Sequence, residues 1–359
     1  SLPPLLHVRV TMLFMVHVFV LLLLVVPTVV VGHGEPLVII STTVDAYYSF
    51  VIPLTTMLWT QLSNYHVHVI IATGNQSHPD KFSQQVSDAE QQLLSLVTDA
   101  IHDFGGSVSL LAGGGAFASQ VGRPLAAAQC GALQPNDADS PWILISDGDM
   151  WPVDLRYFET LSVPSDGQLH ALYANAYPGS QPPMYPMCYL AANCATWRQL
   201  LPGLGDKSLR EAVLLEWEAG EAAHGQRWHT APKAVSPQWF HDQHLIATRL
   251  AAVRAADPDA WEVLPRTRMP MRDRIDRARW PATNESLAAA VARSIDAHLL
   301  RPGYTDDNWP RLRALLTLII RRATRDDASA VATLLESVDE YASSFRTFLE
   351  AGSAARDEL

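Results

Sequence analysis

Short apolar runs alternate with longer amphipathic stretches through the first half of the chain. Strands are predicted at Leu37–Ser41, His66–Ala72, Val108–Leu111 and Trp142–Ser146, because each is a short, mostly apolar run next to polar or glycine-containing turns. Strands that alternate with helices predict a mostly parallel sheet with helices on both faces, the doubly wound α/β class.

Helical periodicity dominates the second half of the chain. A mixed region at residues 168–195 has strand-like pieces broken by prolines. The Ala-rich tail from Arg325 onward is expected to form either a packed helical cap or a loosely attached stalk. Helices are predicted at about residues 48–62, 80–104, 209–223, 240–255, 287–299 and 309–351, and after Gly122 in the segment 120–130.

The two ends of the chain indicate the secretory pathway. Val10–Val31 has no charged residue and follows Arg9, a pattern typical of a membrane anchor or of a signal peptide cleaved before His33. The C-terminal Arg356–Leu359, RDEL, differs by one residue from the KDEL retrieval signal. We therefore expect residence in the endoplasmic reticulum lumen, or in an endoplasmic reticulum or Golgi membrane with the main domain lumenal. The expected segments are 1–34 as leader or anchor, 35–310 as main domain and 311–359 as helical extension.

Charge and cysteine content narrow the possible partners. The chain has 26 Lys and Arg against 37 Asp and Glu, a net charge of -11, which argues against nucleic acid as a partner. Cys130, Cys188 and Cys194 lack the spacing of a zinc site. A Cys188–Cys194 disulfide is expected, with Cys130 as a buried thiol. In a lumenal protein, the sequons at Asn75 and Asn284 would be open to glycosylation.

The segment Asp147-Gly148-Asp149 directly follows the clearest apolar strand, Trp142–Ser146. Ligands of open α/β sheets bind beyond the carboxyl ends of strands. Two carboxylates separated by a glycine can turn toward one divalent cation. An acidic surface turn is the alternative, but the apolar strand before the pair and Met150–Pro152 after it favour a binding site.

The sequence WILISDGDMWP resembles the D-x-D strand of metal-dependent glycosyltransferases with the GT-A fold, and the resemblance extends over about Leu37–Asn308. In that family the motif holds Mn²⁺ or Mg²⁺ against the diphosphate of a nucleotide sugar. The resemblance implies that Asp147 reaches the donor ribose and the metal ion, and that Asp149 is a direct metal ligand.

The same resemblance implies a nucleotide-binding segment after the first strand. Ser41, Thr42, Thr43 and Asp45 lie where these enzymes contact the base and the ribose. A helix cap is the alternative role for this segment. Arg123 resembles the basic residue that contacts the donor phosphates or sugar, and a solvent-facing arginine is the alternative.

Two later segments resemble further parts of the family's site. Trp239–Gln243 resembles an acceptor-side acidic motif, in which Asp242 would take the proton of the acceptor hydroxyl or orient the sugar; the alternative is that Asp242 only begins a helix. In Asp296–Tyr304, His298 resembles a C-terminal histidine that completes the metal site, and Arg301 is suited to a diphosphate.

These residues predict a glycosyltransferase that moves a sugar from a nucleotide sugar to a hydroxyl of a glycan, glycoprotein or glycolipid. UDP-sugars are the favoured donors, followed by GDP-mannose. A base at Asp242 would suit inversion of the anomeric centre, and the same position has other roles in retaining enzymes. The rival functions are a glycoside hydrolase, which needs carboxylates about 5–10 Å apart, and a non-catalytic lumenal carbohydrate-binding protein. An uncleaved Val10–Val31 segment would add a membrane contact.

Overall fold

The chain divides into two compact units, Ser1–His33 and Gly34–Leu359. The apolar Val10–Val31, the sequon at Asn75 and the last two residues of the RDEL sequence lie outside the described residues. Within the described ranges, no helix is both long enough and apolar enough to cross a bilayer. The computed structural model describes residues 36–74, 87–133, 142–159, 161, 165–177, 179–204, 207–231, 236–266 and 273–357.

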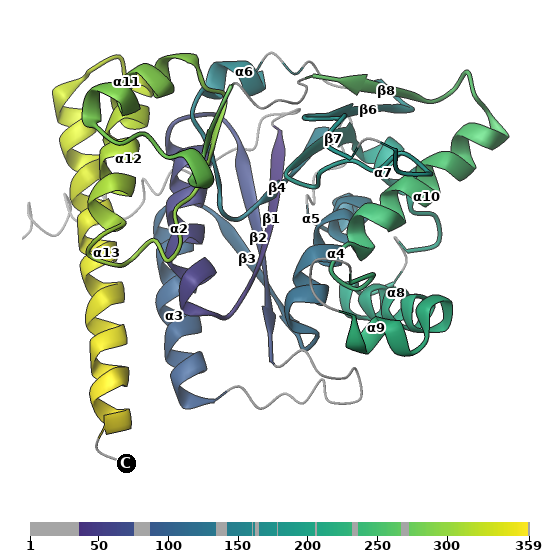
Figure 1. Ribbon diagram of the computed structural model, residues 1–359, viewed down its shortest axis with the longest axis horizontal. Helices are drawn as coiled ribbons and strands as arrows, with labels where there is room; N and C mark the ends of the chain where they lie inside the picture. The colour runs from purple at the N-terminus through teal and green to yellow at the C-terminus, as the bar shows by residue number, and fades with distance from the viewer. Residues whose placement is uncertain are drawn as a thin grey trace, which may run out of the picture. The chain divides into compact units, whose positions relative to one another are not determined.

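A seven-stranded sheet forms the centre of the second unit (Figure 1), in the order β3-β2-β1-β4-β7-β6-β8. Strands β3, β2, β1 and β4 are parallel, β7 is antiparallel to β4 and β6, and β6 is parallel to β8. The predicted α/β class with a mostly parallel sheet is confirmed. The strands are β1 (Leu37–Thr43), β2 (His66–Thr73), β3 (Ser107–Ala112), β4 (Trp142–Asp147), β6 (Gln168–Ala171), β7 (Tyr189–Asn193) and β8 (Glu262–Pro265).

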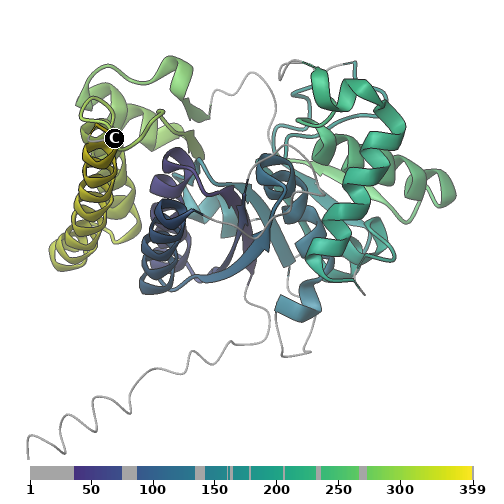
Figure 2. The same ribbon diagram turned by 90° about the horizontal axis from the view of Figure 1, so that it is seen from below.

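Helices cover both faces of this sheet (Figure 2), because successive side chains of each strand point to opposite faces. Val38 and Ile40 pack in one apolar core with α2 and α3, while Leu37 and Ile39 pack in a second core with α4. The helices of the described residues before position 300 are α2 (Ala46–Gln61), α3 (Asp88–Asp103), α4 (Gly115–Ala128), α5 (Cys130–Leu133), α6 (Leu155–Glu159), α7 (Cys194–Leu200), α8 (Leu209–His224), α9 (Gln226–Thr230), α10 (His241–Ala256) and α11 (Asn284–Arg293).

A second, three-stranded sheet consists of β5 (Met150–Pro152), β9 (Arg274–Asp276) and β10 (Asp296–His298), in the order β5-β10-β9. Strand β10 is antiparallel to β5 and parallel to β9. The helix predicted at residues 287–299 is therefore partly wrong. Helix α11 ends at Arg293, and the chain then turns into β10, whose backbone pairs with the strand that follows Asp149.

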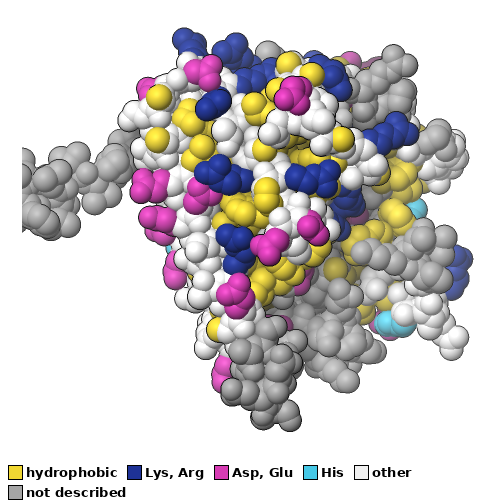
Figure 3. Space-filling view, turned by 60° about the vertical axis from the view of Figure 1, so that its left-hand side comes forward, with side chains coloured by type: hydrophobic (Ala, Val, Ile, Leu, Met, Phe, Trp, Pro, Cys, Tyr) yellow, Lys and Arg dark blue, Asp and Glu magenta, His cyan; other side chains and the backbone are white. Residues whose placement is uncertain are grey.

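The C-terminal helices α12 (Trp309–Ala323) and α13 (Ala328–Asp357) pack against each other, and α13 also packs against α2 and α3. Phe345 is fully buried, and the Tyr341 hydroxyl donates a hydrogen bond to the Ser49 carbonyl at 2.8 Å. The tail is thus a packed cap rather than a stalk. The side of the molecule with these helices carries basic and acidic side chains interspersed with apolar ones (Figure 3).

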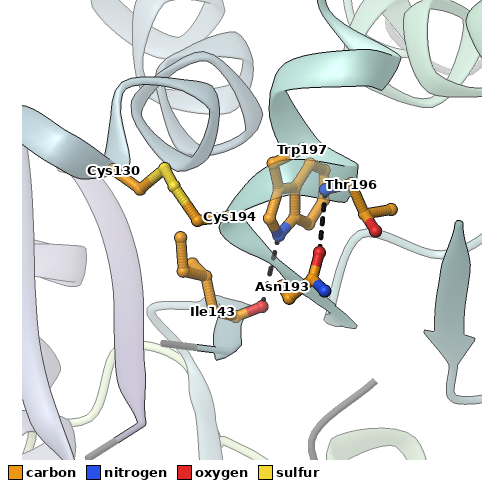
Figure 4. Close-up of a disulfide and its surroundings, with 6 residues drawn as sticks. All are labelled: Cys130, Ile143, Asn193, Cys194, Thr196 and Trp197. Atoms are coloured by element: carbon orange, nitrogen blue, oxygen red, sulfur yellow. Dashed lines mark hydrogen bonds between the residues drawn. A yellow bond between two sulfur atoms is a disulfide. The ribbon is translucent and has the colours of Figure 1, made fainter. Parts of the chain in front are cut away.

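A disulfide joins Cys130 to Cys194 (Figure 4), whereas Cys188 is a buried free thiol. The predicted Cys188–Cys194 pairing is wrong. These two residues flank β7, and an extended strand that rises about 3.3 Å per residue keeps its ends apart. A disulfide needs Cα atoms within about 7 Å, and the Cα atoms of Cys130 and Cys194 are 5.9 Å apart.

Candidate functional site

A cavity of about 850 Å³ opens where β1 and β4 end. This volume is in the range typical of small-molecule sites. Both sheets contribute to its walls, since the walls include residues from β1, β4 and α4 and from β9 and β10. Of the residues predicted for the site, Asp45 alone does not line this cavity. The predicted residues that do are Ser41, Thr42, Thr43, Arg123, Asp147, Asp149, Asp242, His298 and Arg301.

The two aspartates of the D-x-D segment lie on a tight turn between β4 and β5. Asp147 ends β4 and its side chain is partly exposed, whereas Asp149 is buried. A Cβ atom on Gly148 would come 2.3 Å from the Ile52 Cδ1 atom. The Gly148 carbonyl accepts a hydrogen bond from the Thr55 hydroxyl at 2.9 Å. A side chain at Gly148 would have to displace the end of the Ile52 side chain, and the Thr55 hydrogen bond joins α2 to the turn that carries both carboxylates.

Arg123 links the D-x-D segment to Asp242. Its guanidinium donates to Asp147 through Nη1 and to Asp242 through Nη2, the latter at 3.2 Å. The Arg123 side chain is buried, so the solvent-facing alternative is wrong. Burial raises the pKa of Asp242 to about 6, although the charge of Arg123 opposes this shift. Arg123 therefore holds the two carboxylates in fixed relative positions inside the cavity wall.

The Asp149 carboxylate contacts His298, Arg277 and Arg301. The His298 Nε2 atom lies 3.3 Å from Asp149 Oδ2, and the Arg277 Nη1 atom also lies 3.3 Å from it. Arg301 forms an ion pair with the same oxygen. Burial tends to lower the pKa of His298, but the hydrogen bond and the charge of Asp149 outweigh it, so this pKa is raised. The structure thus brings Asp149 together with His298 and Arg301, although Asp149 and Arg301 are 152 positions apart in the sequence.

Two tyrosines at the start of α2 surround Arg301. Its guanidinium carbon lies 4.3 Å from the centroid of the Tyr47 ring and 5.0 Å from that of Tyr48. The Tyr48 hydroxyl accepts a hydrogen bond from Arg301 Nη2 at 3.0 Å. Cation–π contacts of this kind contribute about 0.5–2 kcal/mol, so the tyrosines hold Arg301 at the cavity wall.

A buried ion pair supports the second sheet beneath the site. Arg274 Nε donates to Asp296 Oδ1 at 2.8 Å, and the Tyr173 hydroxyl donates to the same oxygen at 3.1 Å. Arg274 Nη2 also contacts the Cys188 sulfur at 3.6 Å, and burial raises the pKa of this thiol to about 11. These contacts join β9 and β10 to Tyr173 and Cys188, which precede β7 in the sequence.

The end of β1 and the residues just after it have two different roles. The Ser41 hydroxyl donates to the Ser119 carbonyl of α4, and Thr42 and Thr43 line the cavity. Asp45 is the N-cap of α2 and accepts from the Tyr48 backbone N–H at 2.9 Å. The helix-cap interpretation is confirmed for Asp45, while a nucleotide contact by Ser41, Thr42 and Thr43 remains a prediction.

Four residues that line the cavity were not predicted from the sequence to belong to the site: Tyr48, Arg274, Asp276 and Arg277. Strand β9, which carries Arg274 and Asp276, is only 3 residues long. A strand this short has no readable periodicity. Only the run of basic residues around it could have drawn attention to this segment.

The donor atoms at Asp149 fit a hard divalent cation. Two ligand atoms that each lie about 2.1 Å from one ion, at roughly a right angle, are about 3 Å apart. The Asp149 Oδ2 to His298 Nε2 distance of 3.3 Å matches this geometry. Within the described ranges, no group of three or more His, Cys, Asp or Glu residues surrounds a common ion position. Because the Asp147 carboxylate is paired with Arg123, Asp149 and His298 are the side chains that could hold a divalent ion at this position.

The sequence matches no protein-family model and none of the curated proteins. Among solved structures, the chain is similar to the galactosyltransferase LgtC in complex with donor and acceptor sugar analogs, at 11% identity and a TM-score of 0.39, over 78% of this chain and 95% of that one. It is similar to the glycosyltransferase GlyE of Streptococcus pneumoniae, at 12% identity and a TM-score of 0.35, over 74% and 55% of the two chains. A third likeness, at 10% identity and a TM-score of 0.33 over 79% and 98%, is to a glycosyltransferase involved in glycosylation of the major capsid of PBCV-1. At such TM-scores these likenesses assign no function, and the function must be argued from the site.

Proposed function

We propose that this protein is a divalent-metal-dependent glycosyltransferase that uses a nucleotide sugar. The observation that carries the proposal is the convergence of Asp149, His298, Arg277 and Arg301 at one cavity beyond the carboxyl ends of β1 and β4. Carboxylate and imidazole ligands suit Mn²⁺ or Mg²⁺, and paired guanidinium groups suit a diphosphate. A nucleoside diphosphate sugar offers a diphosphate that both the ion and the guanidinium groups can bind.

At the donor end, Arg277 and Arg301 bind the diphosphate. Both guanidinium groups now contact Asp149, and they would transfer these contacts to phosphate oxygens when the donor enters. A bound Mn²⁺ or Mg²⁺ ion supplies Lewis-acid stabilisation of the charge that develops on the leaving diphosphate. Asp149 and His298 would hold that ion, with Asp147 close by. Ser41, Thr42 and Thr43 face the nucleoside.

At the acceptor end, Asp242 is the base that receives the proton of the attacking hydroxyl. It lies in the first turn of α10 and lines the cavity, and an attacking hydroxyl would have to replace the Arg123 contact to reach this buried carboxylate. The neighbouring Gln243 also lines the cavity, and its buried Oε1 atom has no hydrogen-bond partner among the described residues. A hydroxyl of the acceptor or of the transferred sugar would satisfy this oxygen.

A screen of nucleotide sugars tests the proposal. The full chain is incubated with UDP-sugars and GDP-mannose, with Mn²⁺ and with a chelator, and the release of nucleoside diphosphate is measured. We expect metal-dependent release from one donor class, and its loss in Asp149→Asn but not in the surface variant Asp339→Asn. Donor binding without release would support the carbohydrate-binding alternative. Cleavage of glycosides without any nucleotide would support the hydrolase alternative.

A further inference from the structure

Asp276 lies directly beside the His298 imidazole. It ends β9, and in the parallel pairing of β9 with β10 it is the register partner of His298. Its Oδ2 atom is 3.4 Å from His298 Nδ1, while the other ring nitrogen, Nε2, is 3.3 Å from Asp149. The ring therefore lies between two carboxylates, one on each nitrogen.

The orientation of the Asp276 carboxylate is itself fixed. Its Oδ1 atom accepts a hydrogen bond from the Ala278 backbone N–H at 2.8 Å, which caps the 3₁₀ turn η3 (Arg277–Arg279). This contact leaves Oδ2 directed at the imidazole. The next residue, Arg277, turns instead toward Asp149, so it does not neutralise Asp276 at the ring.

A histidine binds a metal ion through a nitrogen that carries no proton, and the proton must then be on the other nitrogen. A carboxylate that accepts a hydrogen bond from that second nitrogen fixes both the tautomer and the direction of the ring. The arrangement of Asp276, His298 and Asp149 has this geometry, with Nδ1 facing Asp276 and Nε2 facing Asp149, the other proposed ligand of the ion. Loss of such an outer carboxylate weakens metal binding about 10- to 100-fold.

We infer that Asp276 is a positioning residue of the donor site, which holds His298 as the Nδ1–H tautomer with Nε2 free to bind the divalent ion. This inference rests on the metal site of the proposed function. It assigns a role to a residue that lies outside both Asp147–Asp149 and the segment Asp296–Tyr304.

The test is Mn²⁺ binding to the full chain without nucleotide, followed through the electron paramagnetic resonance signal of free Mn²⁺. Asp276→Ala should weaken binding about 10- to 100-fold. Asp276→Asn should restore most of the affinity, because its amide oxygen can still accept from Nδ1–H. The exposed Asp307→Ala variant is the matched control and should bind like the unaltered chain. Thermal unfolding of each variant checks that it is folded.

A double variant separates positioning from a general structural effect. In the His298→Ala background, Asp276→Ala should cause no further loss of Mn²⁺ affinity, because the ring that it orients is gone. The role of Asp276 would be overturned if Asp276→Ala lowered Mn²⁺ affinity equally in the unaltered chain and in His298→Ala. It would also be overturned if Asp276→Ala bound Mn²⁺ like the unaltered chain. Neither result would affect the proposed metal site itself. If the unaltered chain binds no Mn²⁺, the metal site of the proposed function fails along with the role of Asp276.

Discussion

At the scale of single residues, the site depends on a few charged side chains whose positions are set by contacts outside the cavity. Arg123 fixes Asp147 and Asp242, and the tight turn at Gly148 fixes Asp149. The sequence identified the two aspartates of the D-x-D segment from the strand before them. It gave no sign that Arg123 would bridge two carboxylates, because that contact joins residues 119 positions apart.

The pH dependence of transfer follows from Asp242. A base accepts a proton only in its ionised form, and burial raises the pKa of Asp242 to about 6. We expect kcat/KM to rise with pH and to level off above about pH 6. Asp242→Asn should remove this dependence and lower kcat by at least about 100-fold, with little change in the affinity for the nucleotide. A rate that falls between pH 5 and pH 7 would be inconsistent with this role.

At the scale of elements, the apolar pattern predicted the parallel strands well, because β1, β2 and β4 are buried on both faces and appear as continuous apolar runs. It failed for β9 and β10. These 3-residue strands are stabilised by pairing with each other and with β5 rather than by their own sequence. His298 was thus predicted to lie near Asp149, which is correct, but it was predicted to lie in a helix and lies in strand β10.

The buried Arg274–Asp296 pair should be essential for the second sheet. Asp296→Asn leaves the Arg274 charge without a full partner in a buried position, and breaking such a pair costs about 3–5 kcal/mol. Urea unfolding should show a loss of this size. Asp339→Asn, in the exposed pair with Arg313, should cost less than about 1 kcal/mol. Similar losses in the two variants would refute the special role of the buried pair.

At the scale of the whole molecule, the second unit has an apolar core on each face of the central sheet, and α13 closes one of them. Phe345 packs against Phe50, Tyr304 and Tyr341. Tyr48 and Arg301 line the donor end of the cavity, close in sequence to Phe50 and Tyr304 of this cluster. The C-terminal cap is therefore expected to stabilise the donor end of the site as well as the fold.

Phe345→Ala should lower the free energy of unfolding by about 3–5 kcal/mol, because it removes a fully buried aromatic side chain. The exposed Thr347→Ala on the same helix should change it by less than about 0.5 kcal/mol. Thermal and urea unfolding measure both values. If Phe345→Ala unfolds like Thr347→Ala, α13 does not belong to the cooperative core.

The disulfide and the exposed sequon make the compartment testable. Disulfides persist in oxidising compartments, and Asn284 is exposed at the start of α11. If the protein is lumenal, Cys130 and Cys194 should resist alkylation in freshly lysed cells until they are reduced. Treatment with an N-glycosidase should then shift the mobility of the chain, and Asn284→Gln should remove that glycan's share of the shift. Free Cys130 and Cys194 in cells would contradict a lumenal location.

The proposed function requires that Asp149 and His298 hold a divalent ion against the donor diphosphate. The most direct measurement is anomalous X-ray scattering from crystals soaked with Mn²⁺ and UDP. We expect a manganese peak about 2 Å from Asp149 Oδ2 and from His298 Nε2. The diphosphate should lie between the ion and the guanidinium groups of Arg277 and Arg301. Bound UDP whose diphosphate contacts only the arginines, with no manganese peak between Asp149 and His298, would contradict this expectation.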